Sequence, residues 1–340
     1  MRHKRIKAGE RIFADQLGNY GFPSNYEWQI ACLSRAFINR LCKTQIIPRC
    51  AHTDSGSHER WTLRPAAPKS PWMAKGEFHK MHGLGNYFVI IDARACPMEM
   101  SPSRARAIAD RKLGIGCDQT ILLGKSQIAD VAMRIFNADG SEVEACGNAS
   151  RCVVALLQQD LKIETKGGVI SGQLSGNAVT VSMGEAKFDW QDIPLAFAMD
   201  SGSLPLAWEE LEKPMAVNMG NPHAVFLVDD ADKVDLARLG PIIEHDAAFP
   251  ERVNVNVGSV QGNEIRLNVW ERGAGLTGAC GTGACATAVA AIKQGKAQSP
   301  VIVHQKGGSL TIAWAPGQHV IMTGNATYVF TGQADWDDFG

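Results

Sequence analysis

The segment EVEACGNASRCVVALL, residues 142–157, has a counterpart later in the chain, LTGACGTGACATAVAAI, residues 276–292. In both copies an Ala-Cys-Gly tripeptide precedes a run of small and apolar residues, which predicts helices over 149–158 and 283–293. Each of the two cysteines therefore stands just before a predicted helix. The repetition predicts an internal duplication, which the residues upstream of each copy can test.

The similarity continues upstream of both cysteines. AMRIFNADGSEVEACG (132–147) aligns with RLNVWERGAGLTGACG (266–281), and each begins with a short alternating strand followed by a turn that contains glycine. A second pair, GNYFVIID (85–92) and GNPHAVFLVDD (220–230), is offset by 135 residues, against 134 for the two cysteines. The two anchors predict an α/β (α+β) fold of two duplicated domains related by a pseudo-twofold axis, with Cys146 and Cys280 facing each other across a cleft.

The charge distribution changes near residue 72. Residues 1–72 hold 12 Lys/Arg and 5 Asp/Glu, a net charge of +7, so the remainder holds 22 and 30, a net charge of −8. A proline-rich stretch, RPAAPKSPW, ends the basic segment, and regular patterning begins at Met73. We therefore predict an extension over 1–72, an N-terminal half over 73–195 and a C-terminal half over 196–335.

The extension permits three interpretations. It is the product of a start codon assigned too far upstream, a disordered basic arm, or a cleaved targeting peptide. The last fits least well, because Glu10, Asp15 and Glu27 conflict with the acid-poor composition of such peptides.

The composition also limits the classes of partner. The net charge of −1 gives no bulk electrostatic basis for binding nucleic acid or a membrane surface. The apolar runs are far shorter than the roughly 20 residues of a membrane-spanning helix. Nine cysteines without a secretory signal predict free thiols in a reducing, cytoplasmic compartment.

A cysteine at the start of a helix can become a reactive thiolate. The unpaired N–H groups there carry about half a positive charge, which can lower a cysteine pKa from ~8.5 to roughly 3.5–7.5. The same N–H groups bind carboxylates. The residues that follow each cysteine allow close backbone approach or add hydrogen bonds: Gly147, Asn148, Gly281 and Thr282. The sequence thus predicts two copies of a reactive sulfur beside an anion-binding helix end.

Other interpretations of these cysteines are open. A single buried cysteine at a helix start is often only a small apolar side chain. The spacings to Cys152 and Cys285, six and five residues, do not match the short spacing of structural zinc sites, and we expect both residues in the core. A disulfide between Cys146 and Cys280 would be a resting or damaged state in a reducing compartment.

A glycine-rich stretch nearby, GAGLTG (273–278), matches a dinucleotide-binding pattern. Such a site also needs an acidic residue about 20 positions further on, and KQGKAQ (293–298) has none. We interpret these glycines as turn residues, and Asp118 and Asp139 as turn and capping residues.

Six motifs, in order, resemble the diaminopimelate epimerase family over about residues 78–330: FHKMHGLGNYFVIID, GIGCDQ, FNADGSEVEACGNASRCV, GNPHAVFLV, ERVNVNV and WERGAGLTGACGTGACA. The chain departs from the family pattern at Tyr87, Ala149 and Gly278, none of which is a matched catalytic position. The extension 1–72 has no counterpart in the resemblance.

The resemblance implies a fold and an activity. Each half would be a mixed sheet or barrel around a central helix, with the active site between the halves and a homodimer as the assembly. The activity would be epimerisation of LL- and meso-2,6-diaminopimelate without cofactor or metal, in the synthesis of lysine and peptidoglycan precursors. Inversion at Cα needs a base on one face and an acid on the other, which two opposed thiols provide.

The resemblance also assigns roles to other residues. His223 and Glu271 would tune and orient the thiols of Cys146 and Cys280. The α-carboxylate would bind at the two helix starts already described. Two groups of side chains would hold the rest of the substrate: Asn86 and Gln119 at its reacting end, and Asn137, Asn221, Asn254, Glu271 and Arg272 at its distal amino-acid group.

Three other functions compete with this one. A proline or hydroxyproline racemase shares the paired thiols but does not need Arg272 and the asparagines for a distal zwitterion. A PhzF-like isomerase should lack the paired thiols. A non-catalytic amino-acid-binding protein could use the same helix starts, but would have no reason for a reactive cysteine.

Overall fold

The computed structural model of the chain describes residues 75–144, 146–176 and 178–339. Its contacts divide the chain into two units, Met1–Trp72 and Met73–Gly340. The predicted extension, 1–72, lies outside the described residues, as do the three interpretations of it. The second unit contains both predicted halves.

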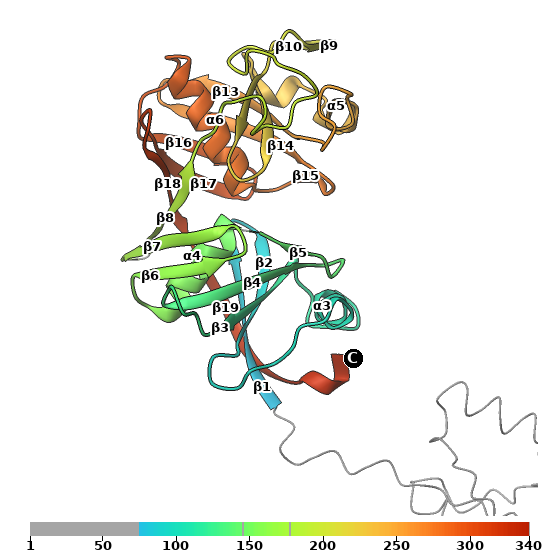
Figure 1. Cartoon of the computed structure of the whole chain (residues 1–340), viewed down its shortest axis with the longest axis vertical. Coiled ribbons are helices and arrows are strands. Elements are labelled where there is room, and N and C mark those ends of the chain that lie inside the picture. Colours follow the sequence, from blue (N-terminus) through green and yellow to red (C-terminus); the bar gives the residue numbers. More distant parts are fainter. Residues whose placement is uncertain (1–74, 145, 177, 340) are drawn as a thin grey trace, which may run out of the picture. The chain divides into compact units, whose positions relative to one another are not determined.

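The first half contains eight strands and two helices among its described residues (Figure 1). Alternating polar and apolar residues produce its strands, and apolar residues at helical spacing produce α4. In chain order the elements are β1 (Lys75–Gly83), β2 (Asn86–Asp92), α3 (Pro102–Ala109), β3 (Gln119–Gly124), β4 (Val131–Asn137), β5 (Glu142–Val143), α4 (Gly147–Leu157), β6 (Leu161–Thr165), β7 (Gly168–Ser175) and β8 (Ala178–Glu185).

The second half follows a short hairpin, β9 (Ala207–Trp208) and β10 (Leu211–Glu212). Its elements are β11 (Met215–Asn218), β12 (Pro222–Leu227), η1 (Ala231–Lys233), α5 (Leu236–Glu244), β13 (Asn254–Gln261), β14 (Glu264–Glu271), β15 (Gly275–Thr277), α6 (Gly281–Lys293), β16 (Val301–Gln305), β17 (Gly308–Ala313), β18 (His319–Asn325), β19 (Thr327–Asp335) and η2 (Trp336–Phe339).

The strand pairing of the first half recurs in the second. β2 lies parallel to β3, β3 antiparallel to β4, and β4 antiparallel to β5 and parallel to β6. In the same way β12 lies parallel to β13, β13 antiparallel to β14, and β14 antiparallel to β15 and parallel to β16. The helices α4 and α6 occupy corresponding places, after β5 and after β15. The predicted duplication and mixed α/β fold are therefore confirmed.

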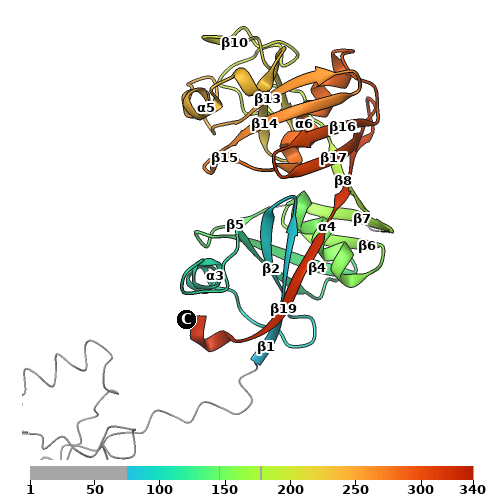
Figure 2. The same cartoon turned by 180° about the vertical axis from the view of Figure 1, so that it is seen from behind.

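Two strand pairs join the halves. β8 pairs antiparallel with β18, and β19 pairs antiparallel with β1 along its length. Figure 2 shows β19 running beside β1, so the end of the chain packs with the beginning of the described unit. The predicted C-terminal half, 196–335, thus includes a strand that belongs to the sheet of the other half, because β1 needs a partner on the edge that β2 leaves open.

Each half packs its strands around one helix. The helix α6, GTGACATAVAAIK, is buried along most of its length because its small side chains let strands approach from several sides. The helix α4 contacts β1, β7 and β8 in the same manner. Both helices begin directly after their cysteine, two residues earlier than predicted, so Cys146 and Cys280 are themselves the N-cap residues.

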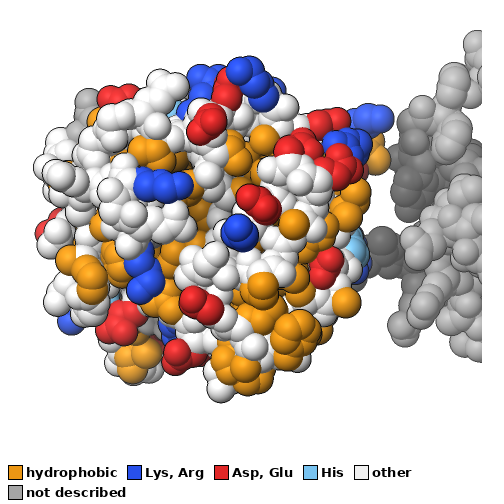
Figure 3. Space-filling view, turned by 90° about the horizontal axis from the view of Figure 1, so that it is seen from above, with side chains coloured by type: hydrophobic (Ala, Val, Ile, Leu, Met, Phe, Trp, Pro, Cys, Tyr) orange, Lys and Arg blue, Asp and Glu red, His pale blue; other side chains and the backbone are white. Residues whose placement is uncertain are grey.

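The surface of the second half mixes side chains of both charges with apolar ones (Figure 3). None of the described helices combines the length and apolarity needed to cross a membrane.

We predict that a polypeptide beginning at Met73 folds by itself, because Met73–Gly340 is one compact unit. Its thermal midpoint, followed by circular dichroism, should lie within about 3 °C of that of the full chain, the shift that roughly 1 kcal/mol produces in a domain of this size. Insoluble protein, or a midpoint lower by more than about 10 °C, would show that residues 1–72 complete the fold.

Candidate active site

A pocket of about 1660 Å³ is lined by both halves of the described unit. It includes the starts of α4 and α6 and the ends of several strands. Of the predicted site residues, these line it: Asn86, Gln119, Asn137, Cys146, Gly147, Asn148, Asn221, Asn254, Glu271, Arg272, Cys280, Gly281 and Thr282. The structure therefore brings together residues that are up to 196 positions apart in the sequence.

Many of these residues form pairs across the repeat. Asn86 and Asn221 are 135 positions apart, and so are Gln119 and Asn254, each of which begins its strand. Offsets of 134 relate three further pairs: Asn137 with Glu271, Cys146 with Cys280, and Asn148 with Thr282. Each half of the duplication thus contributes an equivalent set of pocket residues. Some equivalent residues differ in type, above all Glu271 and Asn137, so the two sides of the pocket are chemically different.

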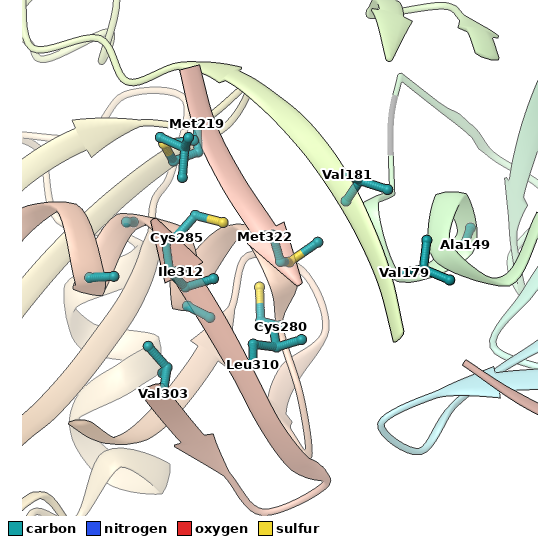
Figure 4. Close-up of a cluster of buried hydrophobic side chains, with 14 of the residues drawn as sticks. Ala149, Val179, Val181, Met219, Cys280, Cys285, Val303, Leu310, Ile312 and Met322 are labelled. Carbon is teal, nitrogen blue, oxygen red and sulfur yellow. The ribbon is translucent and has the colours of Figure 1, made fainter. Parts of the chain in front are cut away.

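The starts of the two helices lie against one side chain, Met322 of β18. A Cβ added to Gly147 would lie 2.6 Å from Met322 Cε, and one added to Gly281 would lie 3.3 Å from Met322 Sδ. Figure 4 shows Met322 between the side chains around Cys280 and those around Val181. The absence of a side chain at Gly147 and Gly281 therefore lets both helix starts lie close to Met322.

The thiol of Cys280 is held by its own helix. Its Sγ accepts the backbone N–H of Gly283 at 3.3 Å and lies 3.4 Å from the hydroxyl of Thr282. The backbone N–H of Cys280 donates to Gln305 Oε1 at 2.7 Å. The thiol of Cys146 caps α4 without a side-chain hydrogen bond to the first turn. Cys280 is consequently the more fixed of the two, and Cys146 the more accessible.

The expected lowering of the two thiol pKa values is not observed. Burial raises the pKa of Cys146, and the N–H of Ala149 only partly offsets this. Burial also raises the pKa of Cys280 well above its ordinary value, and the nearby carboxylate of Glu271 raises it further. Desolvation and the neighbouring anion outweigh the helix ends, so both thiols carry a proton at physiological pH.

Burial also changes the carboxylate that faces Cys280. It raises the pKa of Glu271, while the hydroxyl of Thr277, which donates to Oε1, lowers it. A carboxyl and a thiol that both resist ionisation stand next to each other here, and one proton lost from the pair can come from either group.

His223 does not line the pocket; it lies fully buried behind it. Its Nδ1 lies 3.0 Å from Asn256 Nδ2, and its Nε2 lies 2.9 Å from Asn221 Oδ1. Asn256 Nδ2 also faces the carbonyl oxygens of Ala224 and Asn254, so it must be a donor. His223 is therefore the neutral tautomer that accepts at Nδ1 and donates from Nε2 to Asn221.

Burial lowers the pKa of His223 to about 3. The positive charge of Arg272 lowers the pKa of His223 further. A neutral imidazole that orients Asn221 is the state present at physiological pH.

The loop that carries Glu271 and Arg272 is fixed by a buried carboxylate, Glu244 of α5. Its Oε2 accepts the indole N–H of Trp270 at 2.7 Å, and its Oε1 accepts the backbone N–H of Gly273 at 3.0 Å. Trp270 and Gly273 lie directly before and after Glu271 and Arg272, so Glu244 fixes the backbone on both sides of these two site residues.

Arg272 is held at the pocket by its backbone and by one arm of its guanidinium. Its backbone N–H donates to Asn254 Oδ1 at 2.9 Å, and its NH1 donates to the carbonyl of Glu251 at 2.9 Å. Among the described residues no carboxylate lies within ion-pair distance of it. The remaining donors of the guanidinium are thus available to an anion in the pocket.

Hydrogen bonds also orient the amides on the first-half side. Asp118 Oδ2 accepts from the backbone N–H of Tyr87 at 2.7 Å and from Asn86 Nδ2 at 3.3 Å. Gln119 Nε2 donates to Asn137 Oδ1 at 2.9 Å. Asp118 is expected from the sequence to be a turn or capping residue, but it positions Asn86. The side chain of Asp118 extends from the loop before β3 to the start of β2.

The sequence analysis missed five residues that support the site: Asp118, Arg151, Glu244, Asn256 and Gln305. Asp118, Arg151 and Asn256 stand in the motifs quoted above, but a motif does not show which residue each of them contacts. Each of the five acts on a residue at least three positions away, in most cases more than twenty. Only Asn256, two positions after Asn254 in the NVNV strand, could have been assigned, since residues two apart in a strand share a face.

The remaining cysteine and glycine predictions agree with the structure. Cys152 and Cys285 are fully buried in the core, where burial raises the pKa of each to about 12. Gly273 and Gly275 have positive φ angles of 76° and 84°, as the turn interpretation requires. Asp139 accepts from Ser141 in a turn, also as predicted. The described residues contain no group of three or more His, Cys, Asp or Glu that could hold a metal ion.

The sequence profile of the diaminopimelate epimerase family matches residues 78–189 and 215–329, one segment in each half. The chain belongs to the diaminopimelate epimerase family. Curated relatives agree with this: the diaminopimelate epimerase of Rhizorhabdus wittichii is 62% identical over 265 residues, which cover 77% of this chain and 97% of that one. That of Zymomonas mobilis is 54% identical over 265 residues, 77% of this chain and 98% of that one. Family membership makes the chain an isomerase.

Solved structures show the same fold at low sequence identity. A PhzF-family phenazine biosynthesis protein from Bacillus anthracis superimposes with a TM-score of 0.56 at 16% identity, covering 76% of this chain and 98% of that one. A hydroxyproline epimerase from Agrobacterium vitis gives 0.54 at 16% identity, covering 76% and 92%. These similarities establish the duplicated architecture and no more.

The pKa of His223 predicts a pH-dependent stability. Between pH 6.5 and 3 the unfolded chain binds a proton at this residue that the folded chain does not, so the folded state loses stability as the pH falls. The loss should reach roughly 3 kcal/mol at pH 4.5. Urea unfolding at pH 7 and 4.5 should show that His223→Gln reduces the pH-dependent loss by about this amount.

The exposed histidine His245 supplies the control for the loss of a histidine side chain, and His245→Gln is unfolded in urea at the same two pH values. An equal pH dependence in the unmodified chain and His223→Gln would show that His223 takes up its proton without unfolding.

Proposed function

We propose that the chain interconverts LL- and meso-2,6-diaminopimelate without a cofactor, with Cys146 and Cys280 as the two proton carriers. The observation that carries the proposal is that one cysteine from each duplicated half caps a helix at the same pocket. The reaction places the enzyme in lysine and peptidoglycan-precursor synthesis, in the cytoplasm, where the six described cysteines, all free, would remain reduced.

The reaction consists of two proton transfers at one carbon. A thiolate on one side removes the proton from Cα, so that an S–H bond forms and the C–H electron pair remains on the substrate. The thiol on the other side then donates its own proton to the opposite face of Cα and becomes a thiolate. The configuration is inverted, and the reverse reaction uses the two sulfurs in exchanged roles.

The negative charge that develops on the substrate needs stabilisation in the site. The helices α4 and α6 begin at Gly147 and Gly281, which line the pocket, and N–H groups at these two helix starts would bind the α-carboxylate from two sides. They become more favourable as charge spreads from Cα onto that carboxylate. Asn86 and Gln119, oriented by Asp118 and Asn137, hold the reacting end.

The thiolate has to form as substrate enters, because burial raises the pKa of both thiols and keeps them protonated. Glu271 is the group that supports this step: its raised pKa allows it to take the proton of Cys280, which leaves a thiolate beside a neutral carboxyl. His223 acts at a distance, by fixing Asn221, which lines the pocket, and Asn256, which does not.

The distal end of the substrate carries an ammonium and a carboxylate, and the pocket offers partners for both. Arg272 supplies a guanidinium without a described ion-pair partner, and Glu271 supplies an anion or acceptor. Asn137, Asn221 and Asn254 add donors and acceptors. A proline-type racemase needs none of these groups, and a binding protein needs no pair of opposed thiols.

A homodimer is part of the proposal. The outer strand β19 exposes three large apolar side chains in succession, Tyr328, Val329 and Phe330, each about half accessible. A contiguous apolar strip of this kind favours burial against another chain. A second copy that packs on β19 would cover it and also hold β1 and β19 together.

Replacing either proton carrier should abolish most of the activity. Cys146→Ser and Cys280→Ser should each lose at least about a hundredfold in epimerase turnover, because a hydroxyl is a far poorer base than a thiolate. Turnover is measured by the appearance of meso-diaminopimelate from the LL isomer. Cys96→Ser, which changes an exposed thiol outside the pocket, should keep full activity. Full activity in either of the first two variants would refute the two-base assignment.

Arg272→Lys should raise KM with little change in kcat. A lysine cannot reproduce the planar fork that binds a carboxylate with two hydrogen bonds, and the loss of one charge-assisted bond corresponds to roughly tenfold in KM. Arg266→Lys, on the strand β14 that ends just before Arg272, is the matched control: Arg266 pairs with Asp232 outside the pocket, so its replacement should leave KM unchanged. Unaltered kinetics of Arg272→Lys would place this residue outside the substrate site.

A further inference from the structure

One buried charge has no part in the mechanism so far: Arg151, in the second turn of α4. It is fully buried, yet the described residues provide no carboxylate within ion-pair distance of it. Its NH2 donates to Asn148 Oδ1 at 2.8 Å, its NH1 lies 3.4 Å from Met322 Sδ, and its Nε has no partner. Burial of a guanidinium without a counter-charge costs several kcal/mol. A negative charge that forms near Arg151 during function would offset this cost.

The fold makes room for this side chain at two glycines. A Cβ added to Gly83 would lie 3.3 Å from Arg151 NH2, and one added to Gly324 would lie 3.3 Å from its Nε. The guanidinium is thus enclosed between β1, β18 and its own helix. It has no route to solvent, and a deprotonated arginine is not available as an alternative.

Arg151 fixes the amide of Asn148, a pocket residue. Asn148 Oδ1 is directed to the guanidinium and lies 3.4 Å from the position of a Cβ on Gly281, while its Nδ2 donates to Asn86 Oδ1 at 3.5 Å. Without the guanidinium the amide could turn over, because its two ends differ only in which is the donor. The bond therefore sets which end faces α6 and which faces Asn86.

The titratable neighbours of Arg151 are three thiols. Cys152 on α4 and Cys285 on α6 lie in the core, where the pKa of each is raised to about 12, so neither is an anion at physiological pH. Cys146 remains, and it is the one of the three that lines the pocket. The charged groups that act on Cys146 are Arg151 on its own helix and Glu271 of β14, whereas Glu271 alone acts on Cys280.

We propose that Arg151 is a positioning residue for the first-half side of the site: its guanidinium orients Asn148 and is the fixed positive charge that balances a thiolate on Cys146. The inference rests on the proposed function, in which Cys146 has to become an anion in each catalytic cycle. It makes the two thiols unequal, because the carboxylate of Glu271 acts on both of them, whereas the cation Arg151 acts on Cys146 and not on Cys280.

The test uses the substrate-free full chain and follows alkylation by iodoacetamide from pH 6 to 10, with mass spectrometry to give a separate rate for each cysteine peptide. In the unmodified chain Cys146 should titrate at a lower pH than Cys280. In Arg151→Gln the rate of Cys146 at pH 8 should fall about tenfold, the effect of removing one opposite charge, while that of Cys280 changes by less than about threefold. Arg151→Lys, which keeps the charge, should restore the rate of Cys146 to within about threefold.

Val154→Ala is the matched control for lost packing, since it removes buried volume from the same helix and leaves the guanidinium in place. Its Cys146 rate should equal that of the unmodified chain. The proposal is overturned if Cys280 titrates first in the unmodified chain, if Arg151→Gln slows both thiols equally or neither, or if Arg151→Lys is as slow as Arg151→Gln.

If Arg151→Gln does not fold, two measurements still test the proposal: which thiol titrates at the lower pH in the unmodified chain, and the alkylation rate of Cys146 in Arg151→Lys. None of these readouts requires substrate, so they are independent of whether the unmodified chain converts LL-diaminopimelate, which is measured separately and tests the proposed function.

Discussion

The contact of two helix ends with one methionine is the constraint on which the site depends. The starts of α4 and α6 come from halves that are far apart in sequence, and both lie against Met322. Met322 is held in place because β18 pairs with β8, where it stands opposite Val181. A side chain larger than hydrogen at Gly147 or Gly281 would have to displace the side chain of Met322. The geometry of the chemistry is thus set by the strand pair that joins the halves.

The electrostatics of the pocket show two effects in competition. Helix ends favour an anion at each cysteine, but burial and the carboxylate of Glu271 oppose it more strongly, so the resting thiols are neutral. A site of this kind generates its base only when the substrate has displaced water and brought its own charges. The same burial keeps His223 neutral, which makes it a fixed hydrogen-bonding partner and not a proton carrier. In the proposed mechanism, the groups that exchange protons near Cα are the two thiols and Glu271.

The sequence predicts the architecture and most of the lining because these depend on local patterns that occur twice. The Ala-Cys-Gly openings, the strands before them and the offsets of 134 and 135 are visible in the sequence, and the structure confirms the duplication that they indicate. The supporting residues are different in kind. Glu244 acts on Trp270 and Gly273, and Asp118 on Asn86, through contacts that arise only when distant segments meet.

The sign of the thiol pKa shifts could not be predicted for a related reason. The helix-end effect follows from the position of a cysteine in the sequence, whereas desolvation depends on how many segments cover it, and here it is the larger effect. The placement of β19 beside β1 is likewise a long-range pairing. Arg151 follows Asn148 by three residues in a helix, and from the sequence alone it would be predicted to be exposed. Its burial follows from the packing of β1 and β18 against it.

The most direct test of the two-base account is the first turnover of LL-diaminopimelate in D2O. Product and remaining substrate are separated at low conversion, and deuterium at Cα is measured in each. With two opposed thiols, the meso product should carry deuterium from the start, since its new hydrogen comes from a thiol equilibrated with solvent, while the recovered LL isomer should contain almost none. Deuterium that enters both isomers equally from the first turnover would indicate a single base that serves both faces of the carbon, and would contradict the account.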